Sequence, residues 1–124
     1  MEANRPSAVV AGPDEHGLGE ALAAADVTIT RIDGVVTADA LTSADIGTAA
    51  VFVVTDVEEA TAIPIAKELH PDVFVVTYAD RSLPEFVAGV ADLAIDPALM
   101  DTQIVAAEIA AAVSDDSISD ADEE

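Results

Sequence analysis

Residues 50–78 read AVFVVTDVEEATAIPIAKELHPDVFVVTY. The stretch begins and ends with continuous runs of apolar, β-branched residues, AVFVVT at 50–55 and VFVVTY at 73–78. Continuous runs are typical of strands buried on both faces, as in a parallel sheet that helices cover. The segment between them predicts a helix at 57–69, because Pro71 disfavours helical geometry in the residue before it. Together these segments predict a strand–helix–strand unit with parallel strands.

Two kinds of signal compete for the start of this helix. Thr55 with Glu58, or Asp56 with Glu59, can form a capping box, in which each side chain bonds the backbone N–H of the other residue. Pro64 either kinks the helix or marks its true start. The sequence leaves these alternatives open.

The same alternation of apolar runs and helical patterns extends over most of the chain. Further strands are predicted at 8–11, 27–32 and 93–95, and further helices at 17–25, 39–46, 82–90 and 97–113. The last helix is expected to begin with Asp96 as its N-cap and Pro97 at its first position. Strands that alternate with helices predict one three-layer α/β domain, with a five-stranded parallel sheet in the order 2-1-3-4-5.

Length and cysteine content set further limits. The chain has 124 residues and no cysteine, which fits one domain and excludes disulfides and thiol nucleophiles. We assign the domain to residues 8–113, with residues 1–7 as an N-terminal extension and the acidic residues 114–124 as a disordered tail. The sequence lacks a long apolar stretch and a signal-peptide pattern, so we expect a cytoplasmic protein without membrane insertion.

Charge is the strongest compositional signal. The chain has 25 acidic and four basic residues, for a net charge of −21, yet 52% of its residues are hydrophobic, which favours a folded protein over disorder. Repulsion between the acids destabilises a compact state in dilute buffer, and molar salt screens it. The sequence therefore predicts a halophilic protein from a cytoplasm rich in KCl. It also argues against nucleic acid as a partner, because phosphate binding needs clustered Lys and Arg.

The first predicted strand leads into a loop that contains several glycines. Residues 8–22 read AVVAGPDEHGLGEAL, a strand, a glycine-bearing loop and a helix rich in small residues. This is the layout of a dinucleotide-binding Rossmann unit, in which Gly12, Gly17 and Gly19 would let the backbone approach a phosphate. Alternatively, these glycines only make a tight turn between strand and helix.

Residues 47–79 resemble the regulatory nucleotide-binding domain of potassium channels and transporters, the RCK or TrkA N-terminal domain. The resemblance rests on Thr55-Asp56, Glu58-Glu59, Glu68-Leu69-His70-Pro71 and Tyr78-Ala79. It extends over about residues 8–113 and implies a Rossmann fold with bound NAD(H) or an adenine nucleotide. It also implies that Asp33 bonds a ribose, although Asp33 can equally begin a turn with Gly34.

The glycine loop departs from this family in two ways. It is one or two residues longer than G-x-G-x-x-G, and it includes Asp14 and Glu15, which repel a phosphate. The whole chain also resembles a small family of short haloarchaeal proteins, some labelled CTP synthetase. The residues do not support that label, since the chain lacks a cysteine nucleophile, a Gly-Lys-Ser/Thr phosphate loop and the length for two catalytic domains.

Three functions are compatible with these residues. The first is a non-catalytic regulatory module with a nucleotide site at the switch point between strands 1 and 3, formed by Gly12, Gly17, Gly19, Asp33 and Asp56. Asp56 can alternatively serve only as a helix cap. Such a module can also keep only the shape of the domain and bind a protein, either a second copy or another partner. The second is a small nucleotide-dependent enzyme, although no catalytic or metal-binding residue is predicted.

The third function is a phosphorelay receiver domain. Receivers place acids after strand 1, an aspartate at the end of strand 3 and a threonine or serine at the end of strand 4. Asp14 and Glu15, Asp56, and Thr77 fit these positions loosely. Receivers also place a lysine at the end of strand 5, where this chain has Asp96 followed by Pro97.

Overall fold

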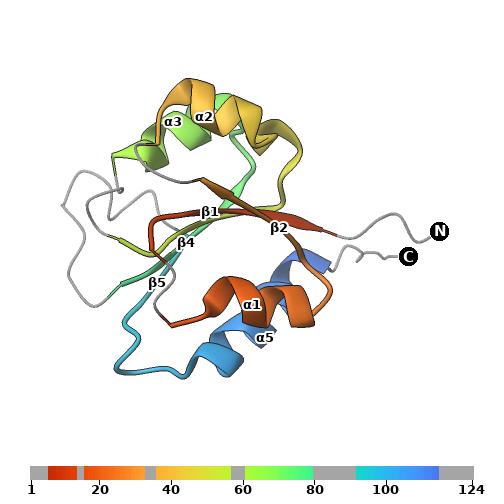
Figure 1. Ribbon diagram of the computed structural model, residues 1–124, viewed down its shortest axis with the longest axis vertical. Coiled ribbons are helices and arrows are strands. Elements are labelled where there is room, and N and C mark those ends of the chain that lie inside the picture. Colours follow the sequence, from red (N-terminus) through yellow and green to blue (C-terminus); the bar gives the residue numbers. More distant parts are fainter. Residues whose placement is uncertain (1–5, 14–15, 33–35, 57–60, 80–91, 115–124) are drawn as a thin grey trace.

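The computed structural model describes residues 6–13, 16–32, 36–56, 61–79 and 92–114 (Figure 1). The strands are β1 (Ser7–Ala11), β2 (Thr28–Ile32), β3 (Val51–Val54), β4 (Phe74–Tyr78) and β5 (Leu93–Ile95). The helices are α1 (Leu18–Ala24), α2 (Ala38–Ser43), the 3₁₀ turn η1 (Ile46–Thr48), α3 (Ala62–Leu69) and α5 (Thr102–Ser114). The five strands form one sheet in the order β2-β1-β3-β4-β5, and every neighbouring pair is parallel. The predicted fold class and strand order are confirmed.

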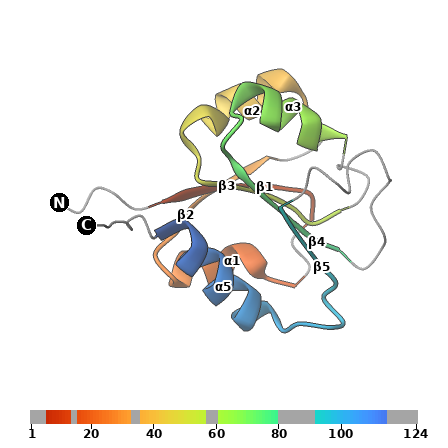
Figure 2. The same ribbon diagram turned by 180° about the vertical axis from the view of Figure 1, so that it is seen from behind.

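Helices cover both faces of the sheet, as the continuous apolar runs predict. Figures 1 and 2 show α2 and α3 on one face and α1 and α5 on the other. Along β3, Phe52 and Val54 pack in the core beneath α2 and α3, and Val51 and Val53 pack in the core beneath α1 and α5. None of these four side chains is exposed, so both faces of β3 are buried.

The last helix begins five residues later than predicted, at Thr102 instead of Pro97. The Asp96 carboxylate accepts a hydrogen bond from Ala98 N at 2.8 Å, within a turn. The Asp101 carboxylate accepts from Gln103 N at 3.0 Å and caps the helix. An aspartate followed by a proline favours a turn as well as a helix start, and here the turn forms.

Two other helices differ from the sequence prediction in their bounds. α3 begins at Ala62, so Pro64 lies in its first turn, where a missing N–H costs no intrahelical bond. The second of the two alternatives for Pro64 is therefore correct. The predicted helix at 39–46 is interrupted after Ser43, because Asp45 adopts a left-handed conformation with φ of 63° before η1. The predicted helix at 82–90 and both capping-box glutamates lie outside the described residues.

Lys67, one of four basic residues in the chain, connects α3 to the sheet. Its Nζ donates to Val73 O at 2.7 Å and to Asp92 Oδ2 at 3.1 Å. Asp92 Oδ2 also accepts from Val75 N at 2.8 Å. This ion pair therefore joins α3 to the segments at the amino ends of β4 and β5.

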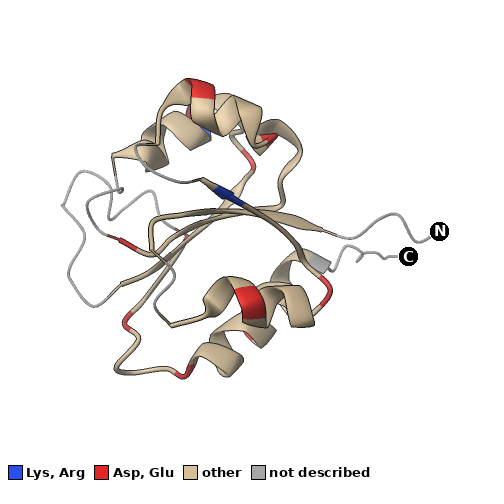
Figure 3. Ribbon diagram, viewed as in Figure 1, with Lys and Arg blue, Asp and Glu red and all other residues tan. Residues whose placement is uncertain are grey.

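Acidic residues are spread over the molecule instead of forming one patch. Figure 3 shows them on both helical layers and on the connecting loops. Within the described part of the chain, no helix is both long and apolar enough to cross a membrane.

Candidate functional site

The candidate site lies at the carboxyl ends of β1 and β3, where the strand order reverses. Ala11 and Val54, the last residues of these strands, are register partners. Gly12 and Asp56 follow them, and a Cβ built on Gly12 would lie 3.1 Å from Asp56 Cβ and from Asp56 N. The fold therefore brings together Gly12 and Asp56, two residues far apart in the sequence, at the predicted switch point.

The Thr55 side chain joins the end of β3 to the loop that follows β1. Its hydroxyl donates to the carbonyl oxygens of Ala11, at 3.2 Å, and Pro13. A Cβ built on Gly12 would lie only 2.8 Å from Thr55 Oγ1, and Gly12 has a φ of 98°. The absence of a side chain at Gly12 therefore lets the β1 loop approach Thr55 and Asp56, as in the tight-turn alternative.

The remaining predicted binding residues are less closely grouped. Gly17 precedes α1 in a left-handed conformation with φ of 73°, and nothing lies within 4 Å of a Cβ built on it. Gly19 is buried within α1. Asp33, and the loop acids Asp14 and Glu15, lie outside the described residues, so the ribose and phosphate roles stay predictions.

Tyr78, the last residue of β4, makes contacts that the sequence does not predict. Its side chain is 2% exposed, and its hydroxyl donates to Met100 O at 3.0 Å and lies 3.0 Å from Thr102 Oγ1. The ring of His16 meets the Tyr78 ring edge to face, with centroids 5.6 Å apart. A buried tyrosine hydroxyl needs a partner, and this one connects β4 to the start of α5.

Thr77 and Asp96 occupy the positions at the ends of β4 and β5 where a receiver has a threonine or serine and a lysine. Thr77 is 3% exposed within β4, where it pairs in register with Val54 and Ala94. Asp96 follows β5 directly, and its carboxylate bonds the turn at Ala98 N. Among the described residues, no group of three or more His, Asp or Glu side chains is placed to hold a metal ion.

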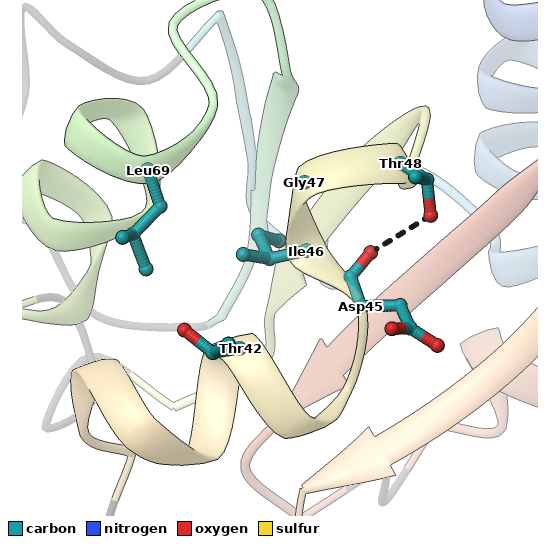
Figure 4. Close-up of a pocket in the computed structure, with 6 residues that line it drawn as sticks. All are labelled: Thr42, Asp45, Ile46, Gly47, Thr48 and Leu69. Atoms are coloured by element: carbon teal, nitrogen blue, oxygen red, sulfur yellow. Dashed lines mark hydrogen bonds between the residues drawn. The ribbon is translucent and has the colours of Figure 1, made fainter.

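A hollow of about 300 Å³ lies between η1 and the ends of α2 and α3, near the amino ends of β3 and β4 (Figure 4). It is lined by Thr42, Asp45, Ile46, Gly47, Thr48 and Leu69. The Thr42 hydroxyl donates to Ala38 O at 2.9 Å and the Thr48 hydroxyl to Asp45 O at 3.2 Å. Both lining hydroxyls therefore use their donors within the chain.

Several solved structures share this fold at low sequence identity. The orphan response regulator HP1043 of H. pylori is 16% identical, with a TM-score of 0.67 over 87% of this chain and 96% of that one. An atypical orphan response regulator, whose structure is described as revealing a phosphorylation-independent regulatory mechanism, is 16% identical, with a TM-score of 0.65 over 87% and 95%. A Burkholderia pseudomallei protein ascribed to pilus assembly is 13% identical, with a TM-score of 0.61 over 86% and 90%.

Sequence comparison adds one family. No curated protein is similar enough to the chain to count as a relative. The family model of DUF7126, a family of unknown function, matches residues 8–109. Because this match spans most of the domain, the protein belongs to the DUF7126 family.

Proposed function

We propose that the protein is a receiver-like regulatory module that binds another protein and works without phosphorylation. The fold shared with response regulators supports the receiver-like part of the proposal. The observation that supports function without phosphorylation is Asp96, which follows β5 at the position where receivers have a lysine.

A phosphoryl group on Asp56 would lack its usual cationic partner. β5 is two strands away from β3, which is about 10 Å at the usual strand spacing. A lysine at the end of β5 has the length and charge to span that gap. Asp96 is shorter and negatively charged, so it repels a phosphoryl group, and its carboxylate already bonds Ala98 N.

The loop after β1 lies against the end of β3. Thr55 directs its hydroxyl into the β1 loop, where it bonds the Ala11 and Pro13 carbonyl oxygens. Gly12 leaves no room beside Thr55 and Asp56 for even a methyl group. The β1 loop is therefore fixed against the end of β3 by contacts within the chain.

Incubation with acetyl phosphate and Mg²⁺ is expected to leave the protein unmodified. Intact-mass spectrometry measures the product, and a phosphorylatable receiver treated in the same KCl buffer shows that the donor is active. Addition of one phosphoryl group to the wild-type chain, lost in Asp56→Asn, would overturn the proposal and establish a phosphorelay receiver.

Nucleotide binding is a second candidate, supported by the glycine at positive φ beside Asp56 at the switch point. The first proposal expects no saturable heat when NAD⁺, NADH, ATP, AMP or CTP is titrated into the protein at molar KCl. Saturable binding of any of them, weakened at least about tenfold by Asp56→Ala, would favour the nucleotide-sensing module instead. Replacing Asp14 and Glu15 by alanine then distinguishes ligands, because loss of acids helps NAD⁺ more than AMP.

A further inference from the structure

Three large apolar side chains are exposed within six residues around the start of α5. Leu99 is 84% exposed, Met100 36% and Ile104 54%. In the described part of the chain, Leu69 is the other large apolar side chain with comparable exposure, at 41%, and it lies at the end of α3, on the other face of the sheet (Figure 1). Single exposed apolar residues are ordinary, but a cluster on a monomer marks an interaction surface.

The turn that carries Leu99 and Met100 is held by side chains of the fold. Asp96 bonds Ala98 N at one end of the turn, and Asp101 bonds Gln103 N at the other. Between them, the buried Tyr78 hydroxyl donates to Met100 O. These bonds hold Leu99 and Met100 in place before any partner arrives, and such preorganisation lowers the entropic cost of binding.

α5 carries apolar residues on its outer side, beside the exposed Gln103 and Glu108, as well as on its inner side. Val105, Ala106 and Ile109 are buried against the core. The outer side presents Ile104, Ala107 and Ala111 at helical spacing, and Glu108 is the single charged residue among the 13 of this helix. A helix that is apolar on both sides is typical of one covered on both sides.

We propose that Leu99, Met100, Ile104, Ala107 and Ala111, together the α5 surface, bind a basic amphipathic helix of another protein. This inference names the partner for the protein-binding module proposed above and rests on it.

Charge decides between a foreign partner and a second copy. The acids Asp96, Asp101 and Glu108 lie beside the apolar residues, and the chain as a whole carries a net charge of −21. Two copies meeting here would bury like charges in direct contact, where salt screens them much less than it screens exposed charges, and this repulsion disfavours the dimer. A helix with apolar residues at i, i+3, i+4 and i+7 and with lysines or arginines beside them complements both features of the surface.

The test uses a synthetic leucine–lysine peptide with its leucines on one helical face. Its binding to the full chain is measured by fluorescence anisotropy at a KCl concentration that keeps the protein folded. Leu99→Ser combined with Ile104→Ser is expected to weaken binding about tenfold or more, because these side chains supply most of the apolar contact. The matched control Leu69→Ser makes the same apolar-to-polar change at the end of α3, on the other face of the sheet (Figure 1), and is expected to leave affinity unchanged.

Charge is tested separately with Asp101→Asn combined with Glu108→Gln, which should weaken binding several-fold and reduce its salt dependence. A peptide of the same composition with scrambled leucines measures non-specific attraction to the acidic chain, and should bind weakly to every variant.

Equal affinity of the Leu99→Ser/Ile104→Ser and Leu69→Ser variants for the leucine–lysine peptide would overturn the inference. A dimer seen by sedimentation that disappears in the α5-surface variant would also overturn it, in favour of self-association. Phosphorylation by acetyl phosphate, in contrast, would refute the proposed function without moving the peptide site.

Discussion

Replacing Gly12 by alanine is expected to lower the free energy of unfolding by about 2–4 kcal/mol. The positive φ of 98° is unfavourable for any residue with a Cβ. The new methyl group would also lie 2.8 Å from Thr55 Oγ1 and 3.1 Å from Asp56 N, and the backbone nitrogen cannot move away as a flexible side chain can. Both the strain and the contact therefore act against the folded state.

Alanine substitutions at Gly17 and Gly47 distinguish the cost of backbone strain from the cost of close contact. Gly17→Ala introduces the same kind of strain at φ of 73°, but into open space, and should cost only about 1–2 kcal/mol. Gly47→Ala meets neither problem and should be near neutral. Unfolding in denaturant at fixed KCl measures all three variants. If Gly12→Ala costs no more than Gly17→Ala, the close approach to Thr55 and Asp56 has no energetic importance.

Lowering the salt concentration is expected to remove the cooperative fold altogether. The chain has a net charge of −21, and the acids among the described residues lie on both helical layers (Figure 3), so no single ion pair can relieve the repulsion. At 1 M salt the Debye length is about 3 Å and neighbouring acids are screened, whereas at 0.1 M it is about 10 Å. We expect the native structure to be lost below roughly 0.5 M KCl.

Circular dichroism over a KCl titration measures this loss directly. Sucrose at matched osmolality is the control, because it favours compact states by exclusion from the protein surface but does not screen charge. Recovery of structure in KCl and not in sucrose identifies screening as the cause. A full native signal in low-salt buffer would contradict the prediction of halophilic adaptation.

The sheet could be predicted from the sequence because the composition of its central strands shows that both of their faces are buried. Val51–Val54 is apolar at every position, and such a run fits a parallel strand with helices on both faces. The start of α5 could not be predicted in the same way. Asp96 and Asp101 are both suitable caps, and local sequence does not show which of them begins a turn and which begins a helix.

For the candidate site, the sequence predicted which residues meet through the strand order but did not predict the side-chain contacts among the loops. The strand order places Gly12 beside Asp56, because both follow strands that are neighbours in the sheet. The hydroxyl bonds of Thr55 and Tyr78 depend on how loops pack after folding, and no spacing in the sequence indicates them. The exposed apolar residues of α5 could not be predicted either, because an apolar helix predicts burial and the sequence does not show which side stays open.

Tyr78, where β4 meets His16 and the turn at Met100, also serves as an intrinsic fluorescence probe of this junction. The chain contains one tyrosine and no tryptophan, so its intrinsic emission near the tyrosine maximum comes from this single ring. That ring contacts His16, and its hydroxyl bonds the backbone of Met100, a residue of the α5 surface. A change in that emission without loss of helix signal therefore reports an event at this junction, observed in the unlabelled wild-type chain.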